Sequence, residues 1–196
     1  MTIQQRPMRA DAIRNRAKIL DAARAEIAAQ GPDVGMEVIA ATAGVAVGTL
    51  YRHFPTKTDL VGAVLAEYVE QITNEAEAAL DRARSGASPL GVIVEFLHEV
   101  IRISAINEAA KSAAPALGAA ADLDESRAAS ALAELIEKGI AAGQIRQDLT
   151  VADIYILISA APLDQEEPVR ERWAALVLPC LTADAARIDL DEVGQR

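Results

Sequence analysis

The feature that most constrains the fold of this chain is its alanine content. Alanine accounts for 42 of the 196 residues, whereas aromatic residues make up only 3%. Alanine has the highest helix propensity, and a β-sandwich would need alternating β-branched and aromatic residues with frequent turns. Apolar residues recur at helical spacing from Asp11, a plausible N-cap, to Gly31-Pro32 and in most later segments. The sequence therefore predicts an all-α protein.

Apolar runs and cysteine content restrict the cellular compartment. The most apolar run, from Ile154 to Leu163, contains Pro162 and is shorter than the roughly 20 residues that span a bilayer. No apolar segment follows the N-terminal arginines, so we expect no secretory signal peptide. The one cysteine, Cys180, cannot form an internal disulfide or a cysteine-only metal site. These features favour a reducing cytoplasm and no membrane partner.

Turn and capping residues divide the chain into about nine predicted helices. Gly31-Pro32 ends the first helix, Gly44 separates two short helices, and Pro55 closes the third. The third helix is followed by a long fourth one. Five more helices are expected over residues 88–101, 107–114, 122–142, 150–161 and 168–181, the last kinked or ended by Pro179.

The start of the fourth helix marks a boundary between an N-terminal domain, called the head, and the rest of the chain, called the body. Thr56 and Asp59 match a capping box, which opens a helix that lasts to Ser85-Gly86. Its length of about 27 residues corresponds to roughly 40 Å, enough to join two domains. The expected organisation is a flexible basic arm (residues 1–10), a helix-turn-helix head (11–58) and a helical body (59–196).

Charge is distributed unevenly between these parts. Residues 1–58 hold eight basic and five acidic side chains, whereas the remaining 138 residues hold 11 basic and 24 acidic ones. The head is therefore positive although the chain carries a formal net charge of −10. A basic head on an acidic body suggests that only the head meets a polyanion.

The most informative stretch, residues 39–57, has the pattern of a helix-turn-helix. Gly44 permits a tight turn between two short helices, with a small core formed by Ile39, Ala40, Val45 and Leu50. Small residues at the start of the second helix let the backbone approach a groove floor, and its polar groups suit phosphate contacts. Lys57 begins the next helix, where free N–H groups also attract phosphate. The expected DNA-binding residues are Val47, Gly48, Thr49, Tyr51, Arg52, His53 and Lys57.

This stretch closely resembles the DNA-binding domain of the TetR family of bacterial regulators. The shared pattern is Ala-Gly-Val, then Gly-Thr-Leu-Tyr-x-His-Phe, then Lys57 at a fixed offset, with its core over residues 36–60. The resemblance implies that Val47 and Gly48 face bases, that Leu50 and Phe54 anchor the helix, and that phosphates are contacted by Thr49, Tyr51, His53 and Lys57.

Two positions depart from the family pattern. Ala46 stands where a serine often caps the recognition helix. Met36-Glu37 stands where many members carry Thr or Ser with a basic residue, so the second helix is expected to contribute less to DNA binding.

The body resembles the family's regulatory domain more weakly, through residues 143–148 and 173–181. The resemblance implies a homodimer that binds a palindromic operator, usually as a repressor, and an unidentified small-molecule effector. The last two helices carry apolar residues on more than one face, and the expected interface comprises Ile154, Leu157, Ile158, Trp173, Leu176 and Val177. Helical phase proposes effector contacts from Leu65, Tyr68, Phe96, His98, Arg102, Ile103, Asn107 and Tyr155.

Two other classes of protein remain as alternatives. An enzyme is disfavoured because the chain has two histidines, one cysteine, no metal-ligand spacing and no glycine-rich phosphate loop after a strand. No cofactor is expected. An all-helical adaptor or dimerisation scaffold without ligand control would use the same fold for protein contacts. Arg6 and Arg9 either form a disordered tail or enter a minor groove.

Overall fold

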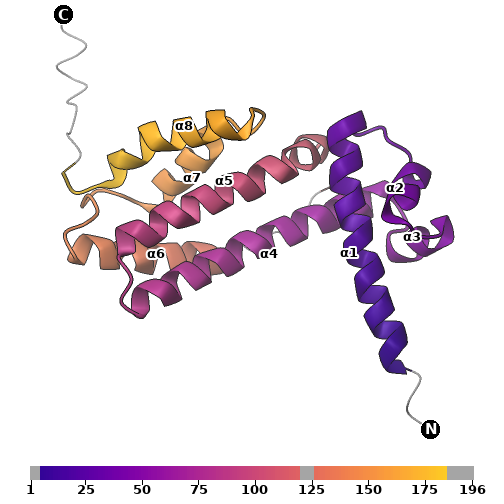
Figure 1. The fold of residues 1–196 in the computed structure, drawn as a ribbon, viewed down its shortest axis with the longest axis horizontal. Helices are drawn as coiled ribbons and strands as arrows, with labels where there is room; N and C mark the ends of the chain where they lie inside the picture. The colour runs from indigo at the N-terminus through magenta and orange to yellow at the C-terminus, as the bar shows by residue number, and fades with distance from the viewer. Residues whose placement is uncertain (1–4, 120–125, 185–196) are drawn as a thin grey trace, which may run out of the picture. The chain divides into compact units, whose positions relative to one another are not determined.

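The computed structural model describes residues 5–119 and 126–184, and within these ranges it contains helices and no strand. The prediction of an all-α fold is therefore confirmed. The described residues form eight α-helices, which are labelled in Figure 1, and a short 3-10 helix, η1. Their bounds are α1 Gln5–Gln30, α2 Met36–Ala43, α3 Val47–His53, α4 Lys57–Arg84, α5 Pro89–Ala113, α6 Ser126–Ala141, α7 Val151–Ala160, α8 Glu167–Val177 and η1 Leu178–Leu181.

The chain packs into two compact units. Among the described residues, the first combines residues 5–71 with residues 103–119, and the second combines residues 72–102 with residues 126–184. Helices α4 and α5 are thus each divided between the two units. The first unit therefore extends beyond residue 58, where the sequence predicted the boundary between the head and the body.

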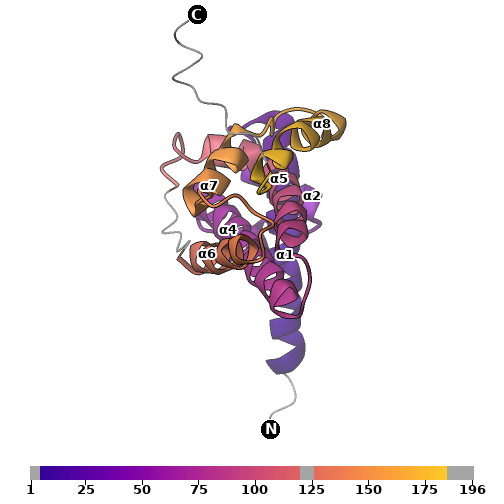
Figure 2. The same cartoon turned by 90° about the vertical axis from the view of Figure 1, so that its left-hand side faces the viewer.

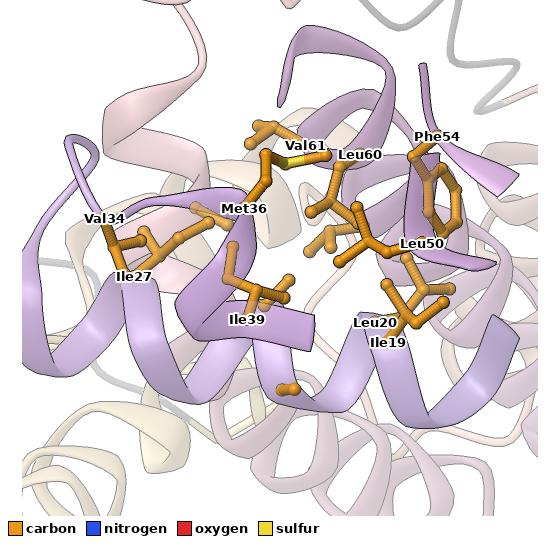
Figure 3. Packing of buried hydrophobic residues seen from close by; sticks show 14 of the residues in the cluster. Ile19, Leu20, Ile27, Val34, Met36, Ile39, Leu50, Phe54, Leu60 and Val61 are labelled. Carbon is orange, nitrogen blue, oxygen red and sulfur yellow. The ribbon is translucent and has the colours of Figure 1, made fainter. Parts of the chain in front are cut away.

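The core of the first unit joins α1, α2, α3 and the beginning of α4. Figure 3 shows apolar side chains from these helices pointing toward one another. Ile19, Ile39 and Leu50 are fully buried in this cluster. At the end of α2, Gly44 adopts φ 65° and its N–H bonds to the carbonyls of Ala40 and Ala41, which makes the turn into α3. The helix-turn-helix predicted from the sequence is present.

The second unit has a separate core, in which Figure 2 shows α6, α7 and α8 around α5 and the end of α4. Phe96, Leu132 and Ile154 are among its buried side chains. Gly139 of α6 is also buried, and a Cβ built there would lie 2.2 Å from the Cδ1 atom of Ile145. The absence of a side chain at this position lets the segment after α6 fold back onto the helix.

Capping and helix-stop predictions are confirmed at three places. The N–H of Asp59 donates to Thr56 Oγ1 at 3.1 Å, and the N–H of Thr56 donates to Asp59 Oδ2 at 2.9 Å. Thr150 makes the same reciprocal pair at the start of α7. The α-helical part of α8 ends at Val177, and Pro179 lies in η1, as expected from its missing N–H.

Two predicted boundaries are wrong. Helix α1 begins at Gln5, so residues 5–10, which were predicted to belong to a flexible arm, are helical. Pro7 falls in the first turn, where a helix tolerates proline. The helices expected over 88–101 and 107–114 are one helix, α5, because residues 102–106 contain neither Gly nor Pro.

Some sequence predictions fall outside the described residues. These include residues 1–4 of the predicted arm, the side chains of Arg6 and Arg9, and the predicted helix start at residues 122–125. Among the described helices, none combines the length and the apolarity that crossing a membrane requires.

Candidate nucleic-acid interface

Helix α3 presents one open face and one buried face. Val47 and Tyr51 are 38% and 42% exposed, and Gly48 and Arg52 are exposed as well. A Cβ added at Gly48 would meet no atom within 4 Å, so the backbone is accessible there. Leu50 and Phe54 are buried, which confirms that they anchor the helix. The arrangement leaves the candidate base-reading positions on the open face.

The remaining predicted phosphate contacts are partly covered. Thr49, His53 and Lys57 are half-buried. The Nζ atom of Lys57 donates to the backbone carbonyl of Val34 in the loop before α2. Desolvation lowers the pKa of Lys57 below its usual value, and the charge of Asp33 acts in the opposite direction. Lys57 is thus tied to the loop before α2, although an ammonium group has three donors and only one is used in this bond.

Tyr51 has a polar partner that the sequence did not predict. Its hydroxyl donates to Glu37 Oε1 in the first turn of α2 at 3.2 Å. Partial desolvation raises the pKa of the Tyr51 hydroxyl above its ordinary value, and the charge and hydrogen bond of Glu37 raise it further. The neighbouring carboxylate thus favours the protonated form of the phenol, which donates to it.

Arg16 of α1 is a further basic residue beside α3 that sequence analysis did not single out. Its guanidinium lies 5.7 Å from the centre of the Phe54 ring, a cation–π contact. The ring of Phe54 is in turn 6.1 Å from the ring of His53. The basic charge of residues 13–18 was visible in the sequence, but only the fold shows that Arg16 reaches the end of α3.

A cavity of about 580 Å³ lies between α5 and α8 in the second unit. His98 and Arg102, both proposed from helical phase as effector contacts, are two of its lining residues. Arg102 Nε donates to Glu99 Oε2 at 2.8 Å, and this bond lowers the pKa of the Glu99 carboxyl. The α8 wall carries the charged residues Glu167, Arg170 and Glu171 and the small residues Ala174 and Ala175.

The other proposed effector residues do not line this cavity. Phe96 is fully buried in the second core, and Tyr155 is half-buried on α7. Leu65, Tyr68, Ile103 and Asn107 belong to the first unit. There the Tyr68 hydroxyl lies 3.0 Å from Ser104 Oγ, and Asn107 Oδ1 accepts from Arg24 Nε at 3.0 Å. Among the described residues, no cluster of three or more His, Cys, Asp or Glu side chains could hold a metal ion.

The residues proposed for the dimer interface fall into two groups. Ile154 is fully buried in its own core, and Leu157, Ile158 and Trp173 pack partly against that core. Leu176 is 63% exposed, and Val177 is half-buried. Sequence analysis missed the exposed side chains of Ile156 and Val169. On α8, helical spacing places four apolar residues on one face, which we call the α8 face: Val169, Trp173, Leu176 and Val177.

Family comparisons match both units of the chain. The family described as "Bacterial regulatory proteins, tetR family" matches residues 19–64, which include the helix-turn-helix. A second family, "Transcriptional regulator SbtR-like, C-terminal domain", matches residues 88–183.

Two curated relatives are repressors. The HTH-type transcriptional repressor LfrR of Mycolicibacterium smegmatis is 38% identical over 96 residues, which cover 43% of this chain and 50% of LfrR. The HTH-type transcriptional repressor KstR of the same organism is 44% identical over 77 residues, which cover 38% of this chain and 35% of KstR. The chain thus matches about half the length of the first relative and about a third of the second.

Solved structures match nearly the whole chain. The TetR transcription regulatory protein from Mycobacterium vanbaalenii is 34% identical with a TM-score of 0.68, and the match covers 90% of this chain and 99% of that one. The TetR transcriptional regulator SCO0520 from Streptomyces coelicolor is 29% identical with a TM-score of 0.69, and covers 87% of this chain and 99% of that one.

Proposed function

Because this chain belongs to the TetR family of bacterial transcriptional regulators, we propose that it is a ligand-responsive repressor that binds a palindromic operator as a dimer and is released by a small molecule. The observation that carries the proposal is the open face of α3, where Val47, Gly48 and Tyr51 are accessible while Leu50 and Phe54 anchor the helix behind them. Such a short, rigidly held helix fits the major groove. Repressor is the name given to both LfrR and KstR.

In the proposed complex, Val47 and Gly48 read base edges, and Thr49, Arg52, His53 and Lys57 contact phosphates. Base-edge contacts carry sequence information, whereas phosphate contacts set the register and the salt dependence. Two copies of α3 related by a two-fold axis would meet two inverted half-sites. The centres of the half-sites would lie roughly 34–36 Å apart, or a small multiple of that distance.

The α8 face supports the proposed dimer. Leu176 and Val169 are exposed apolar side chains of α8, and other residues of this helix line the cavity that it shares with α5. Association of two such faces through a two-fold axis would remove this apolar surface from water. The interface would combine the α8 face with the exposed Ile156 of α7.

The cavity between α5 and α8 is the proposed effector site. Its charged and small apolar walls suit a small polar or aliphatic ligand. Since α5 runs from this cavity into the first unit, a ligand that shifts α5 has a covalent route to the DNA-binding unit. Bound effector would then lower the affinity for the operator, and bound operator would lower the affinity for the effector by the same factor.

A competition titration tests the proposal. Labelled duplexes covering the DNA that flanks the chain's own gene are titrated with the protein, beside shuffled duplexes of the same composition. A regulator binds one flanking duplex at least ~10³-fold more tightly than its shuffled version. Equal affinity for both would contradict the proposal and favour the adaptor alternative. Compounds that raise the melting temperature are then added to the complex, and an effector must weaken operator binding.

A further inference from the structure

Glu37 and Tyr51 form a pair on the exposed surface of the helix-turn-helix. Glu37 lies in the first turn of α2, and its Oε1 accepts the hydrogen bond from Tyr51 on α3 at 3.2 Å. Its other carboxylate oxygen lies over Gly35, where an added Cβ would be only 3.2 Å from Oε2. Glycine at this position therefore leaves space for the carboxylate, and the amino end of α2 is a favourable place for negative charge.

The chemistry of the two groups makes this bond exclusive. A phenol has one O–H donor, whereas a carboxylate only accepts hydrogen bonds. While Tyr51 donates to Glu37, it has no proton left for a DNA phosphate. Lys57 differs in this respect, because its bond to the carbonyl of Val34 uses one of three donors. The contact from Glu37 thus withholds Tyr51 from phosphate but leaves Lys57 available.

We propose that Glu37 limits phosphate binding by α3, because it keeps the hydroxyl of Tyr51 from DNA phosphates and thereby lowers the affinity for DNA of any sequence. This inference rests on the proposed DNA-binding function. The negative charge of Glu37 beside the phosphates acts in the same direction. A non-specific duplex offers the protein chiefly phosphates, so it reports the occupied donor without a contribution from base edges.

A double-mutant cycle on a non-specific duplex tests the inference. Four proteins are titrated by fluorescence anisotropy at several salt concentrations: wild type, Glu37→Ala, Tyr51→Phe and the double variant. We expect Glu37→Ala to tighten non-specific binding about tenfold and Tyr51→Phe alone to have little effect. When Tyr51 is already replaced by phenylalanine, Glu37→Ala should raise the affinity for the non-specific duplex no more than about threefold, because only the effect of the charge remains. An equal gain in both backgrounds, or no gain from Glu37→Ala, would overturn the inference.

A matched control separates the pair from a general effect of charge. Glu26 of α1 is a half-buried carboxylate of the same unit, and it accepts from Thr42 Oγ1 at 2.6 Å without contacting Tyr51. Glu26→Ala should leave non-specific binding within about twofold of wild type. If Glu26→Ala matched Glu37→Ala, the inference would be wrong.

A spectroscopic titration examines the bond without DNA. The chain has three tyrosines, and Tyr51 is identified by loss of its signal in Tyr51→Phe. Replacement Glu37→Gln keeps an acceptor but removes the charge, so the pKa of Tyr51 should fall relative to wild type. An unchanged pKa would refute the pairing. Failure of wild type to prefer its flanking DNA would instead contradict the proposed function, so the two failures are distinguishable.

Discussion

Arg24 of α1 donates from Nε to the side-chain oxygen of Asn107 of α5 at 3.0 Å, across 83 positions of sequence. The same guanidinium donates from Nη2 to Glu67 Oε2 of α4 at 2.7 Å, and the Arg24 side chain is only 10% exposed. Asn107 also donates from its amide to the carbonyl of Ile103 at 2.8 Å. Three helices of the first unit are thus joined by one partly buried polar cluster, which connects the helix that supports α2 and α3 to α4 and α5.

Replacement of Asn107 by leucine should destabilise the protein. Arg24 Nε would lose its partner while it stays largely buried, which costs roughly 1–3 kcal/mol of unfolding free energy. Urea denaturation measures the change. The matched control is Asn74→Leu at an exposed position of α4, which should stay within about 0.5 kcal/mol of wild type. Equal effects of the two substitutions would show that the cluster contributes no stability.

Replacement Lys57→Ala should weaken binding to every duplex alike. A lysine that neutralises one phosphate contributes about 0.9 to the slope of log affinity against log salt, and the variant should lose that amount. Titrations at several salt concentrations measure both quantities. Lys138→Ala in α6 removes the same charge from the second unit and serves as the control. A salt slope equal to that of wild type would remove Lys57 from the set of phosphate contacts.

Replacement Val47→Ala should change which bases are preferred and leave the salt slope unchanged. The side chain is apolar and exposed on α3, so its contacts on DNA would be to base edges such as thymine methyl groups. Selection from a pool of randomised duplexes compares the preferred sequences. Val38→Ala on α2 is an equally exposed control, at 39% against 38% for Val47. An identical preferred sequence for wild type and Val47→Ala would contradict base reading by this residue.

Replacement Leu176→Glu should convert the proposed dimer into a folded monomer. The side chain is 63% exposed, so the charge is tolerated in a single copy but would be buried on the two-fold axis of the α8 face. Light scattering at micromolar concentration measures the mass. Ile106→Glu, at a 51% exposed position of α5 in the first unit, should remain dimeric. A wild-type protein that is monomeric at this concentration would contradict the interface.

Replacement Gly139→Ala should destabilise the second unit even though alanine favours helices. The new Cβ would lie 2.2 Å from Ile145 Cδ1 and 2.7 Å from its Cγ1, so the buried Ile145 side chain would have to change its rotamer, and the Ile145 Cβ at 3.3 Å would still be in tight contact. Overpacking of this kind costs about 1–3 kcal/mol, which exceeds the gain of roughly 1 kcal/mol in helix propensity. Thermal denaturation of the variant decides between the two effects, and a raised melting temperature would contradict the packing argument.

Sequence reasoning succeeded where the determining interactions are local. The capping pair Thr56 and Asp59, the turn at Gly44 and the helix end near Pro179 each depend on residues within a few positions of one another. The open face of α3 was also predictable, because helical spacing separates Leu50 from its exposed neighbours. The helix break predicted after Ile101 is absent. Only the spacing of apolar residues suggested this break, and the segment contains no helix-breaking residue.

Features that depend on distant contacts could not be predicted. The partner of Tyr51 is a side chain 14 positions away on another helix, and Arg24 reaches Asn107 across the first unit. The cavity between α5 and α8 is lined by the small side chains of Ala174 and Ala175 and by charged residues of both helices. Its position depends on which helix faces meet, so only two of the eight residues proposed from helical phase, His98 and Arg102, line it.

Hydroxyl-radical footprinting on the DNA that flanks the chain's own gene tests the central claim most directly. The account predicts two protected segments of inverted sequence, whose centres lie about 10–10.5 base pairs apart or a small multiple of that spacing. Protection should disappear with Lys57→Ala at protein concentrations that protect fully with wild type. Uniform protection along the whole duplex, or none at micromolar protein, would contradict the claim that α3 reads an operator.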